Sequence, residues 1–468
     1  MELRKSLEMD KFDNECKKEN KIECKKIREY RSTEYDVERN EHIETGEYCS
    51  SYPIVLKSDG TVWDKASLYI DFLRSDRNRS SALLRTAGND LLDFLRFMEA
   101  NNLNMLHLPI KKAQRVTFRY RHDLLEREKE FKLNGHKKIG RNTISQRINR
   151  IVDFYEFCIE NKIFTFTELD NRPYTLLKKR IYFEDEKGFT QKKVVRSSDL
   201  SIPRAPRAIQ TSNSIKDGRK LHPLTEQEQS IFISYLKASN NRVLQLICLI
   251  ALTTGARIQS ICTLRVNDIK NMMNSKKVKG SFKEIEIGGG ESIDNKNDKK
   301  YIIFFHTELL EMLSNYINSE EWKERSTQSY YKNKNNYVFL TKFGEPFYTS
   351  RKELEDRKNR LFPVSKPFSE KDGKAVYKNM KDLFQKMEND KQLIRKFSIH
   401  DLRATFGLNL VHLLQKYGVP ESHIIEEVRE RMGHKDRETT YLYLNYSAKN
   451  KLYESVKQEF VELIYCFN

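Results

Sequence analysis

Apolar residues recur at helical spacing in the first half of the chain, which predicts a helical domain over residues 59–167. One helix is marked by Leu91, Leu92, Leu95 and Met98. A second is expected to start near Asn142, where either Asn142 or Thr143 can cap it. Its apolar face is formed by Ile144, Ile148, Ile151, Val152 and Tyr155.

The other side of this second helix is polar and basic. Together with the residue at its start, it carries Arg141, Ser145, Gln146, Arg147, Asn149 and Arg150. A helix that reads bases in the major groove of DNA presents such a face, so these residues are candidate DNA contacts. A merely solvated helix has the same composition, and the segment by itself favours that simpler interpretation.

Charged segments flank the helical domain on both sides. Residues 1–58 mix both signs of charge, which fits surface helices and partial disorder equally well. Residues 168–220 lack apolar periodicity, and residues 194–220 among them contain two prolines and many cations, so we expect an extended basic linker. Arg204 and Arg207 within it are candidate contacts to a DNA backbone, although a basic linker can equally serve solubility alone.

A second domain is predicted from residue 221 to residue 468. Thr225 and Glu228 have the spacing of a capping box, which predicts that a helix begins there. Residues 243–252 are typical of a buried helix, ended by a turn at Gly255. Strand-like runs at 282–287 and 301–305 are separated by glycines and a polar loop, so they predict a β-hairpin with a long tip.

The rest of this domain is expected to be helical around an insertion. Residues 320–388 are polar and predict an insertion with short strands and helices, whereas helices resume from Ser398. The tail 444–468 has an amphipathic pattern that suits packing on its own domain or on a neighbouring protomer, formed by Leu452, Val456, Phe460 and Leu463. The fold class is thus mostly α with a small antiparallel β-hairpin.

Composition indicates a polyanionic partner. The chain has 468 residues with 85 Lys and Arg against 67 Asp and Glu, a formal net charge of +18. Such an excess attracts phosphate groups non-specifically. Hydrophobic residues make up 38% of the chain, enough to build cores, which argues against disorder throughout.

Cysteine usage and hydropathy suggest a soluble intracellular protein. The seven cysteines include no C-x-x-C pair, so we expect reduced thiols without a disulfide framework or zinc site. The N-terminus lacks an apolar signal core, and the longest apolar run, 246–252, is too short to span a bilayer. We therefore expect cytoplasmic localisation, at the nucleoid if the source is bacterial.

Five cations and one tyrosine in the second domain suit attack on a phosphodiester. They are Arg257, Lys296, His400, Arg403, His434 and Tyr443. His400 and Arg403 form an H-x-x-R pair, which a helix places on one face. Arginine and histidine can hold phosphate oxygens, and a tyrosine can take the phosphorus as a covalent ester. The sequence shows no P-loop and no metal-ligand cluster, so we expect no cofactor.

The order and local context of these residues resemble those of the tyrosine recombinase (phage integrase) family over the last half of the chain. The resemblance implies that Tyr443 attacks the phosphate and forms a 3′-phosphotyrosine. Tyr441 and Tyr446 are nearby alternatives, but the spacing from the Gly-His pair favours Tyr443. The resemblance also implies which residues stabilise the charge of the phosphate, namely Arg257, Arg403 and His434.

Two further residues would move protons. By the same resemblance His400 handles the proton of the tyrosine and Lys296, on a hairpin, protonates the leaving 5′ oxygen. Lys299 and Lys300 are rivals for the lysine. One position departs from the family pattern, since a carboxylate often stands three residues after the first arginine and Ser260 stands there in this chain.

The resemblance implies a site-specific recombinase that integrates, excises or transposes a mobile element. Its two domains would form a C-shaped clamp on double-stranded DNA, and a homotetramer would act on two duplexes at a specific recombination site. Accessory proteins, the target sequence and the direction of reaction are left open. Two other functions compete, a type IB topoisomerase-like relaxase with the same chemistry and a DNA-binding regulator with a non-catalytic recombinase fold.

Overall fold

The computed structural model describes most of the chain, which divides into two compact units. The described residues are 23–27, 30–49, 51–77, 79–134, 139–164, 171–184, 190–203, 214–275, 278–295, 300–358, 369–392 and 395–449. Unit 1 comprises Met1–Ala208 with Lys358–Glu370, and unit 2 comprises Ile209–Arg357 with Lys371–Asn468. No helix in the described ranges is long and apolar enough to cross a membrane.

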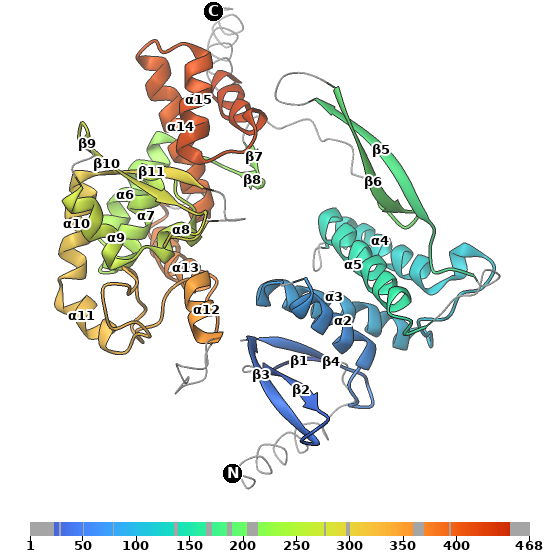
Figure 1. The fold of residues 1–468 in the computed structure, drawn as a ribbon. Helices are drawn as coiled ribbons and strands as arrows, with labels where there is room; N and C mark the ends of the chain where they lie inside the picture. Colours follow the sequence, from blue (N-terminus) through green and yellow to red (C-terminus); the bar gives the residue numbers. More distant parts are fainter. Residues whose placement is uncertain are drawn as a thin grey trace, which may run out of the picture. The chain divides into compact units, whose positions relative to one another are not determined.

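The described part of unit 1 starts with strands at residue 23, where we expected surface helices or disorder, and residues 1–22 lie outside the described residues. β1 (Glu23–Ile27) pairs with β4 (Tyr52–Leu56), and β2 (Tyr30–Asp36) pairs with β3 (Glu41–Cys49), both antiparallel (Figure 1). β4 is the apolar member, and its Val55 is fully buried in the core of the unit. The N-terminal segment is therefore part of this unit's core from β4 onward.

The helices of unit 1 confirm the helical prediction for residues 59–167. They are α2 (Asp64–Ser75), α3 (Ser81–Ala100), the 3-10 helix η1 (Lys112–Gln114), α4 (Val116–Asn134) and α5 (Arg141–Glu160). The predicted apolar stripes of α3 and α5 are buried against each other and against an aromatic cluster that includes Phe94, Tyr120, Phe154 and Tyr155.

A β-hairpin occupies most of the region expected to be an extended linker. β5 (Leu176–Glu184) pairs with β6 (Thr190–Ser198) in register over their full length, and the pair forms a long ribbon (Figure 1). Pattern analysis missed these strands because cations interrupt their apolar alternation. Arg204 and Arg207 lie outside the described residues.

Unit 2 carries a second, shorter hairpin followed by a helical domain with a small sheet. Its elements are β7 (Ile215–Asp217), β8 (Arg219–Leu221), α6 (Glu226–Lys237), α7 (Arg242–Thr254), α8 (Ile258–Thr263), α9 (Val266–Asn274), β9 (Val278–Lys279), β10 (Phe282–Ile287), β11 (Tyr301–His306), α10 (Thr307–Ile317), α11 (Glu320–Thr327), α12 (Arg351–Lys358), α13 (Lys374–Asn389), α14 (Ile399–Lys416) and α15 (Glu421–Met432). Residues 437–449 are also helical.

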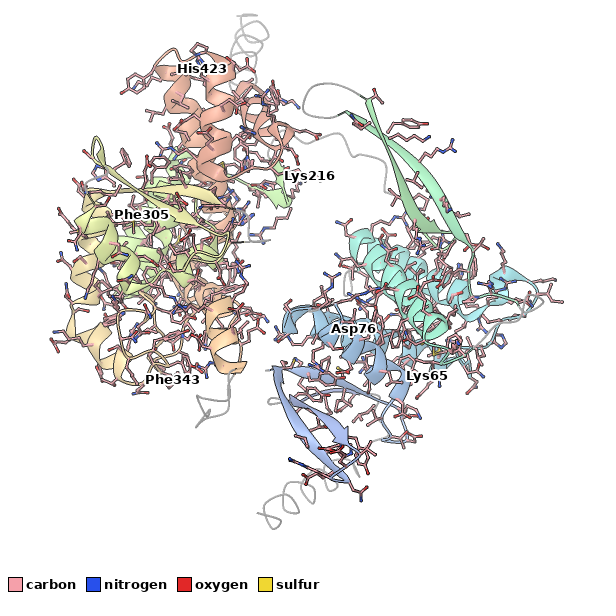
Figure 2. The ribbon with its side chains drawn as sticks, in the orientation of Figure 1. Lys65, Asp76, Lys216, Phe305, Phe343 and His423 are labelled. Atoms are coloured by element: carbon pink, nitrogen blue, oxygen red, sulfur yellow. The ribbon has the colours of Figure 1, made fainter. Side chains whose placement is uncertain are left out.

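The local predictions for unit 2 are confirmed at its start. The Thr225 and Glu228 capping box is present, and α7 ends at Gly255, which has a left-handed φ of 66°. The predicted hairpin is β10 with β11, to which β9 adds a third antiparallel strand. Figure 2 labels Phe305 on β11, a buried side chain in the core that α7 also lines.

Segment 320–388, which we expected to be an insertion in the second domain, is divided: residues 320–357 and 371–388 belong to unit 2, whereas Lys358–Glu370 belongs to unit 1. Within its described part the regular elements are α11, α12 and α13, and strand pairing is limited to isolated bridges. Buried residues of α13, including Val376, Met380 and Leu383, belong to the main core with α6 and α7. Its polar composition reflects surface helices around a few core positions.

The start of unit 2 is fastened to its last third. Arg395 binds the Glu228 carboxylate at 2.9 Å and donates to the carbonyls of His222 and Pro223. The amide of His222 donates to Asp401 on α14 at 2.8 Å. The chain before α6 and the chain at α14 therefore form one structural block.

We predict that Gly433→Ala destabilises unit 2 more than Gly418→Ala. Both glycines follow a helix end with positive φ, 56° at Gly433 and 69° at Gly418. A Cβ at Gly433 would lie 2.7 Å from the Tyr301 ring, whereas nothing lies within 4 Å of one at Gly418. Gly418→Ala should lower the free energy of unfolding by about 1–2 kcal/mol, and Gly433→Ala by roughly 1–3 kcal/mol more. Denaturant unfolding measures both, and equal losses would contradict the ring contact.

Candidate active site

Arg403 holds two helix ends together in the centre of unit 2. It is fully buried on α14, and its guanidinium donates to the carbonyls of Gly255 and Met432. These carbonyls stand at the C-terminal ends of α7 and α15, where carbonyls lack helical partners and the helix dipole is negative. Arg257 comes two residues after Gly255, and His434 comes two residues after Met432. The hydrogen bonds of Arg403 therefore fix the backbone positions from which both side chains extend into the site.

Arg257 lies at the start of α8, directly after the turn at Gly255. Its guanidinium donates to the Asn295 side chain at 3.3 Å. Burial, together with the nearby charge of Arg403, lowers the pKa of Arg257 below its ordinary value. The Nε–H of Arg403 has no hydrogen-bond partner among the described residues. Two guanidinium groups of one site are thus desolvated, which strengthens their attraction for an anion.

His434 follows Gly433, which ends α15 with a left-handed backbone. The ring is buried, its Nδ1 lies 3.0 Å from Thr440 Oγ1, and its Nε2 lies 3.3 Å from the Asp217 carboxylate. Burial lowers the pKa of His434, although the contact with Asp217 acts in the opposite direction. The ring is oriented by Thr440 on one side, so its Nε2 faces the site.

Tyr443 is fully buried on the helical segment 437–449, with its ring centroid 5.6 Å from that of His434. Its hydroxyl donates to Asp217 Oδ2 at 3.3 Å. Burial and the charge of Asp217 raise the pKa of Tyr443 well above its usual range, while Arg403 and Arg257 act to lower it. In this arrangement the phenol stays protonated.

His400 lies in the first turn of α14, which Ser398 and Asp401 cap reciprocally. Burial, aided by the charge of Arg403, lowers the pKa of His400 to about 4, against the opposing effect of Asp217. The imidazole is therefore neutral near neutral pH, and a neutral imidazole can accept a proton.

Asp217 is a member of the site that the sequence analysis missed. It lies on β7 in the region expected to be a linker, next to Lys216, which Figure 2 labels. Burial by itself raises the pKa of the Asp217 carboxyl, but His434, Arg403 and His400 outweigh it and hold the pKa below its ordinary value. An Asp-Gly pair is a turn signal, so Asp217 and Gly218 could have revealed the turn.

The catalytic lysine stays a prediction. Lys296 and Lys299 lie outside the described residues. Lys300 lies within them, exposed, with its Nζ 2.5 Å from Glu286 and 3.7 Å from Glu291. The Glu286 contact raises the pKa of Lys300.

Ser260 does not supply the carboxylate that the family pattern often has. It is buried on α8, and its hydroxyl has no hydrogen-bond partner in the described part of the chain. The carboxylate in the site comes instead from Asp217, which contacts Tyr443 and His434.

Comparison with known proteins gives a family match over the part of the chain that holds these residues. Residues 223–450, which include every predicted catalytic residue, match the model of the phage integrase family. Residues 223–450 form a domain of the phage integrase family. This match assigns the chain to the tyrosine site-specific recombinases, enzymes that act in DNA recombination. No curated protein sequence matches the chain.

Several solved structures of recombinases are distantly similar. A XerH site-specific recombinase bound to palindromic difH substrate is 15% identical, with a TM-score of 0.46 and 84% of each chain covered. The Tn1549 transposon integrase in complex with a circular intermediate DNA is 15% identical, with a TM-score of 0.43, covering 83% of this chain and 99% of that one. A lambda integrase dimer bound to a COC′ core site is 12% identical, with a TM-score of 0.43, covering 81% and 94%. The family assignment rests on the family model and not on these likenesses.

The predicted DNA-reading face of α5 divides into exposed and inward-facing residues. Gln146 and Asn149 are exposed, and Ser145 is half-buried. The cations contact other residues of unit 1 instead of standing free: Arg141 binds Glu128 at 2.9 Å, Arg147 binds Asp93 at 2.8 Å, and Arg150 donates to the Tyr69 hydroxyl at 3.2 Å.

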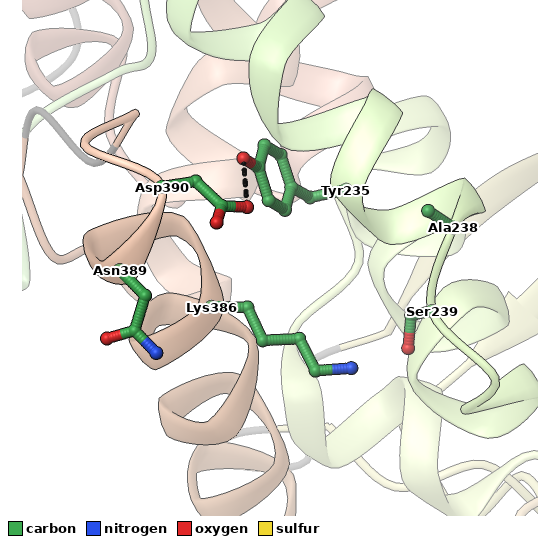
Figure 3. A pocket seen from close by; sticks show the side chains of 6 residues that line it. All are labelled: Tyr235, Ala238, Ser239, Lys386, Asn389 and Asp390. Atoms are coloured by element: carbon green, nitrogen blue, oxygen red, sulfur yellow. Dashed lines mark hydrogen bonds between the residues drawn. The ribbon is translucent and has the colours of Figure 1, made fainter.

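The integrase site is separate from the pocket shown in Figure 3. That pocket, of about 400 Å³, lies between α6 and α13 and shares no lining residue with the site. A hydrogen bond of 2.6 Å from Tyr235 to Asp390 crosses it. Among the described residues no cluster of His, Cys, Asp and Glu could hold a metal ion, and the cysteines described are free.

We predict that Arg147→Gln destabilises unit 1, whereas Gln146→Ala does not. Arg147 is the nearest cation to the buried carboxylate of Asp90, at 3.6 Å, and also pairs with Asp93. Removing one partner of a largely buried pair should lower the free energy of unfolding by on the order of 3 kcal/mol. Gln146→Ala, at an exposed position, should stay within about 0.5 kcal/mol of the wild type. Weaker DNA binding by Arg147→Gln at unchanged stability would instead place Arg147 in the DNA interface.

Proposed function

We propose that this integrase-family protein cleaves and rejoins DNA through a 3′-phosphotyrosine on Tyr443, as a site-specific recombinase of a mobile element. One observation supports this proposal above all. The Tyr443 hydroxyl lies in one buried site with His434, in the electric field of Arg403 and Arg257. A nucleophile surrounded by cations is the arrangement that stabilises a pentavalent phosphate.

In the proposed cleavage step the Tyr443 oxygen attacks the scissile phosphorus. A bond forms between that oxygen and phosphorus, and the bond from phosphorus to the 5′ oxygen breaks. Arg257, Arg403 and His434 neutralise the charge that develops on the non-bridging oxygens. In the rejoining step a 5′ hydroxyl of the partner duplex attacks the ester and releases the tyrosine, so one bond is exchanged for another of similar energy.

Two proton transfers accompany the cleavage step. The neutral His400 accepts the proton of the Tyr443 hydroxyl, since its pKa of about 4 keeps the ring free of a proton near neutral pH. The leaving 5′ oxygen takes a proton from a lysine of the β10–β11 hairpin, for which Lys296 is our first candidate.

The partner is double-stranded DNA at a specific recombination site. Exchange between two duplexes cuts four strands in total, and a chain with one Tyr443 supplies one ester, so we propose a homotetramer that proceeds through a Holliday junction. Unit 1 would contribute the exposed polar side chains of α5, Gln146 and Asn149, to recognition of the duplex.

We predict that Tyr443→Phe abolishes covalent attachment to DNA while DNA binding is retained. The substitution removes the attacking oxygen and leaves the cations in place. The measurement is made in a host that carries the native locus: cells are denatured rapidly, and DNA left covalently bound to the protein is sequenced. Adducts at one discrete site are expected for the wild type, and none for Tyr443→Phe.

Tyr441→Phe and Tyr446→Phe are the matched controls, because each removes a hydroxyl from the same helical segment. Both variants should form adducts at the wild-type site. Adducts that persist in Tyr443→Phe and vanish in a control would reassign the nucleophile. Adducts scattered over the genome would favour a type IB relaxase, and binding without adducts in the wild type would favour a regulator.

A further inference from the structure

The β5–β6 ribbon presents one strongly cationic face. Lys178 pairs with Arg196 across the strands, Arg180 with Val194, and Tyr182 with Lys192. Side chains alternate between the faces of a strand, so these residues share one face. All of them are exposed, and Tyr182 retains 63% of its accessible surface.

This face carries four cations and, by the same alternation, one carboxylate at its far end, Glu184. Among the side chains that the structure describes, none of the four cations lies within ion-pair distance of a carboxylate, whereas the cations of α5 are paired with acidic residues of unit 1. Lys178 stands directly opposite Arg196, and like charges in that position destabilise a strand pair. An anionic partner bound to this face would reduce the repulsion between these cations.

The ribbon is held firmly at its root. Tyr174, just before β5, is buried and donates to Glu156 at 2.7 Å. Asp199, just after β6, accepts from the Thr175 amide at 2.9 Å and from Lys112 at 2.9 Å. Both ends are thus fixed to the helices of unit 1, which presents the cationic face in a defined direction and reduces the entropy lost on binding.

We propose that this face, Lys178, Arg180, Lys192 and Arg196 with Tyr182, binds the backbone of duplex DNA outside the strand-cleavage site. A two-stranded antiparallel ribbon fits the major groove, and its cations can release condensed counterions from several phosphates. The proposal rests on the proposed function, because it takes DNA as the partner.

The test is a salt titration of binding to a fluorescent mixed-sequence DNA duplex by the full chain. Replacing the four cations together by Gln should make the slope of log K against log salt shallower by about 0.9 for each phosphate that is no longer neutralised, up to roughly 3.6. A charge-retaining variant, with Lys and Arg exchanged at the same positions, should keep the wild-type slope. A charge-matched variant carries Gln at the exposed positions Lys342, Lys378, Lys381 and Lys386 of unit 2.

An unchanged slope in the ribbon variant, or an equal loss in the charge-matched variant, would overturn the proposal. Covalent capture separates this result from the proposed function. If the wild type forms adducts and the ribbon variant keeps its slope, the function stands and the ribbon proposal fails. If no variant forms adducts and the ribbon variant loses its slope, the ribbon binds DNA and the strand-cleavage proposal fails.

A different observation concerns Asp217. Its Oδ2 lies 3.3 Å from the Tyr443 hydroxyl and 3.3 Å from His434 Nε2. A scissile phosphate must reach the same two groups, because its phosphorus has to approach the nucleophile to about 3–3.5 Å and its oxygen accepts from the histidine. The carboxylate therefore stands where the phosphate is needed.

We infer that Asp217 occupies the phosphate position in the DNA-free protein and must withdraw before Tyr443 can react. Two anions in one site repel each other strongly at such short range. Asp217 lies at the tip of β7, next to the turn at Gly218, where φ is 68° and a side-chain carbon would meet no atom within 4 Å. Gly218 is thus not packed against other described residues, whereas Ile215 and Leu221 of the same hairpin lie in the core.

Asp217→Asn tests this inference, with Asp217→Ala as the second variant. Both should form the Tyr443 adduct several-fold faster than wild type on a suicide DNA substrate, and inorganic phosphate should raise the Tm of both variants more than that of the wild type. The Tm measurement does not depend on cleavage, so it separates this inference from the proposed function. Slower adduct formation with unchanged phosphate stabilisation would overturn it and make Asp217 a positioning residue for Tyr443.

Discussion

One buried guanidinium determines the geometry of the site. Arg403 has no solvent around it, and burial of an unpaired cation would cost several kcal/mol. Its guanidinium instead donates hydrogen bonds to the carbonyls of Gly255 and Met432, which lie at the C-terminal ends of α7 and α15. The planar fork of an arginine can bind two carbonyls at once, which the single point charge of a lysine cannot do in the same geometry. Arg257 and His434 are placed by this contact.

The concentration of positive charge also explains why the site contains a carboxylate. Arg257 and Arg403 would repel each other in a dry interior if no anion balanced them. Asp217 supplies that balance in the free protein, and a DNA phosphate can supply it in a complex. The same two guanidinium groups would thus be balanced by Asp217 in the free protein and by a phosphate in a DNA complex.

Local patterns in the sequence predicted the parts of the structure that depend on near neighbours, such as the capping box at Thr225 and the helix that ends at Gly255. Asp217 was missed because its partner Tyr443 is 226 positions away, and no local pattern reports such a contact. The N-terminal strands and the β5–β6 ribbon were missed for a different reason. Apart from β4, which is apolar and mostly buried along its length, these two-stranded sheets bury little, so their sequences lack the apolar alternation by which strands are recognised. Charge then dominated the interpretation, and we expected a tail and a linker.

The hydrogen bonds that join His222, at the start of unit 2, to Arg395 and Asp401 affect how the chain folds as it is synthesised. The segment before α6 finds its partners, Arg395 and Asp401, only after more than a hundred further residues have left the ribosome. Contacts this distant in sequence make folding slow and cooperative. A chain that is released before residue 403 contains Arg257 but lacks the Arg403 contact to the turn that precedes it. The site is therefore completed only late in synthesis.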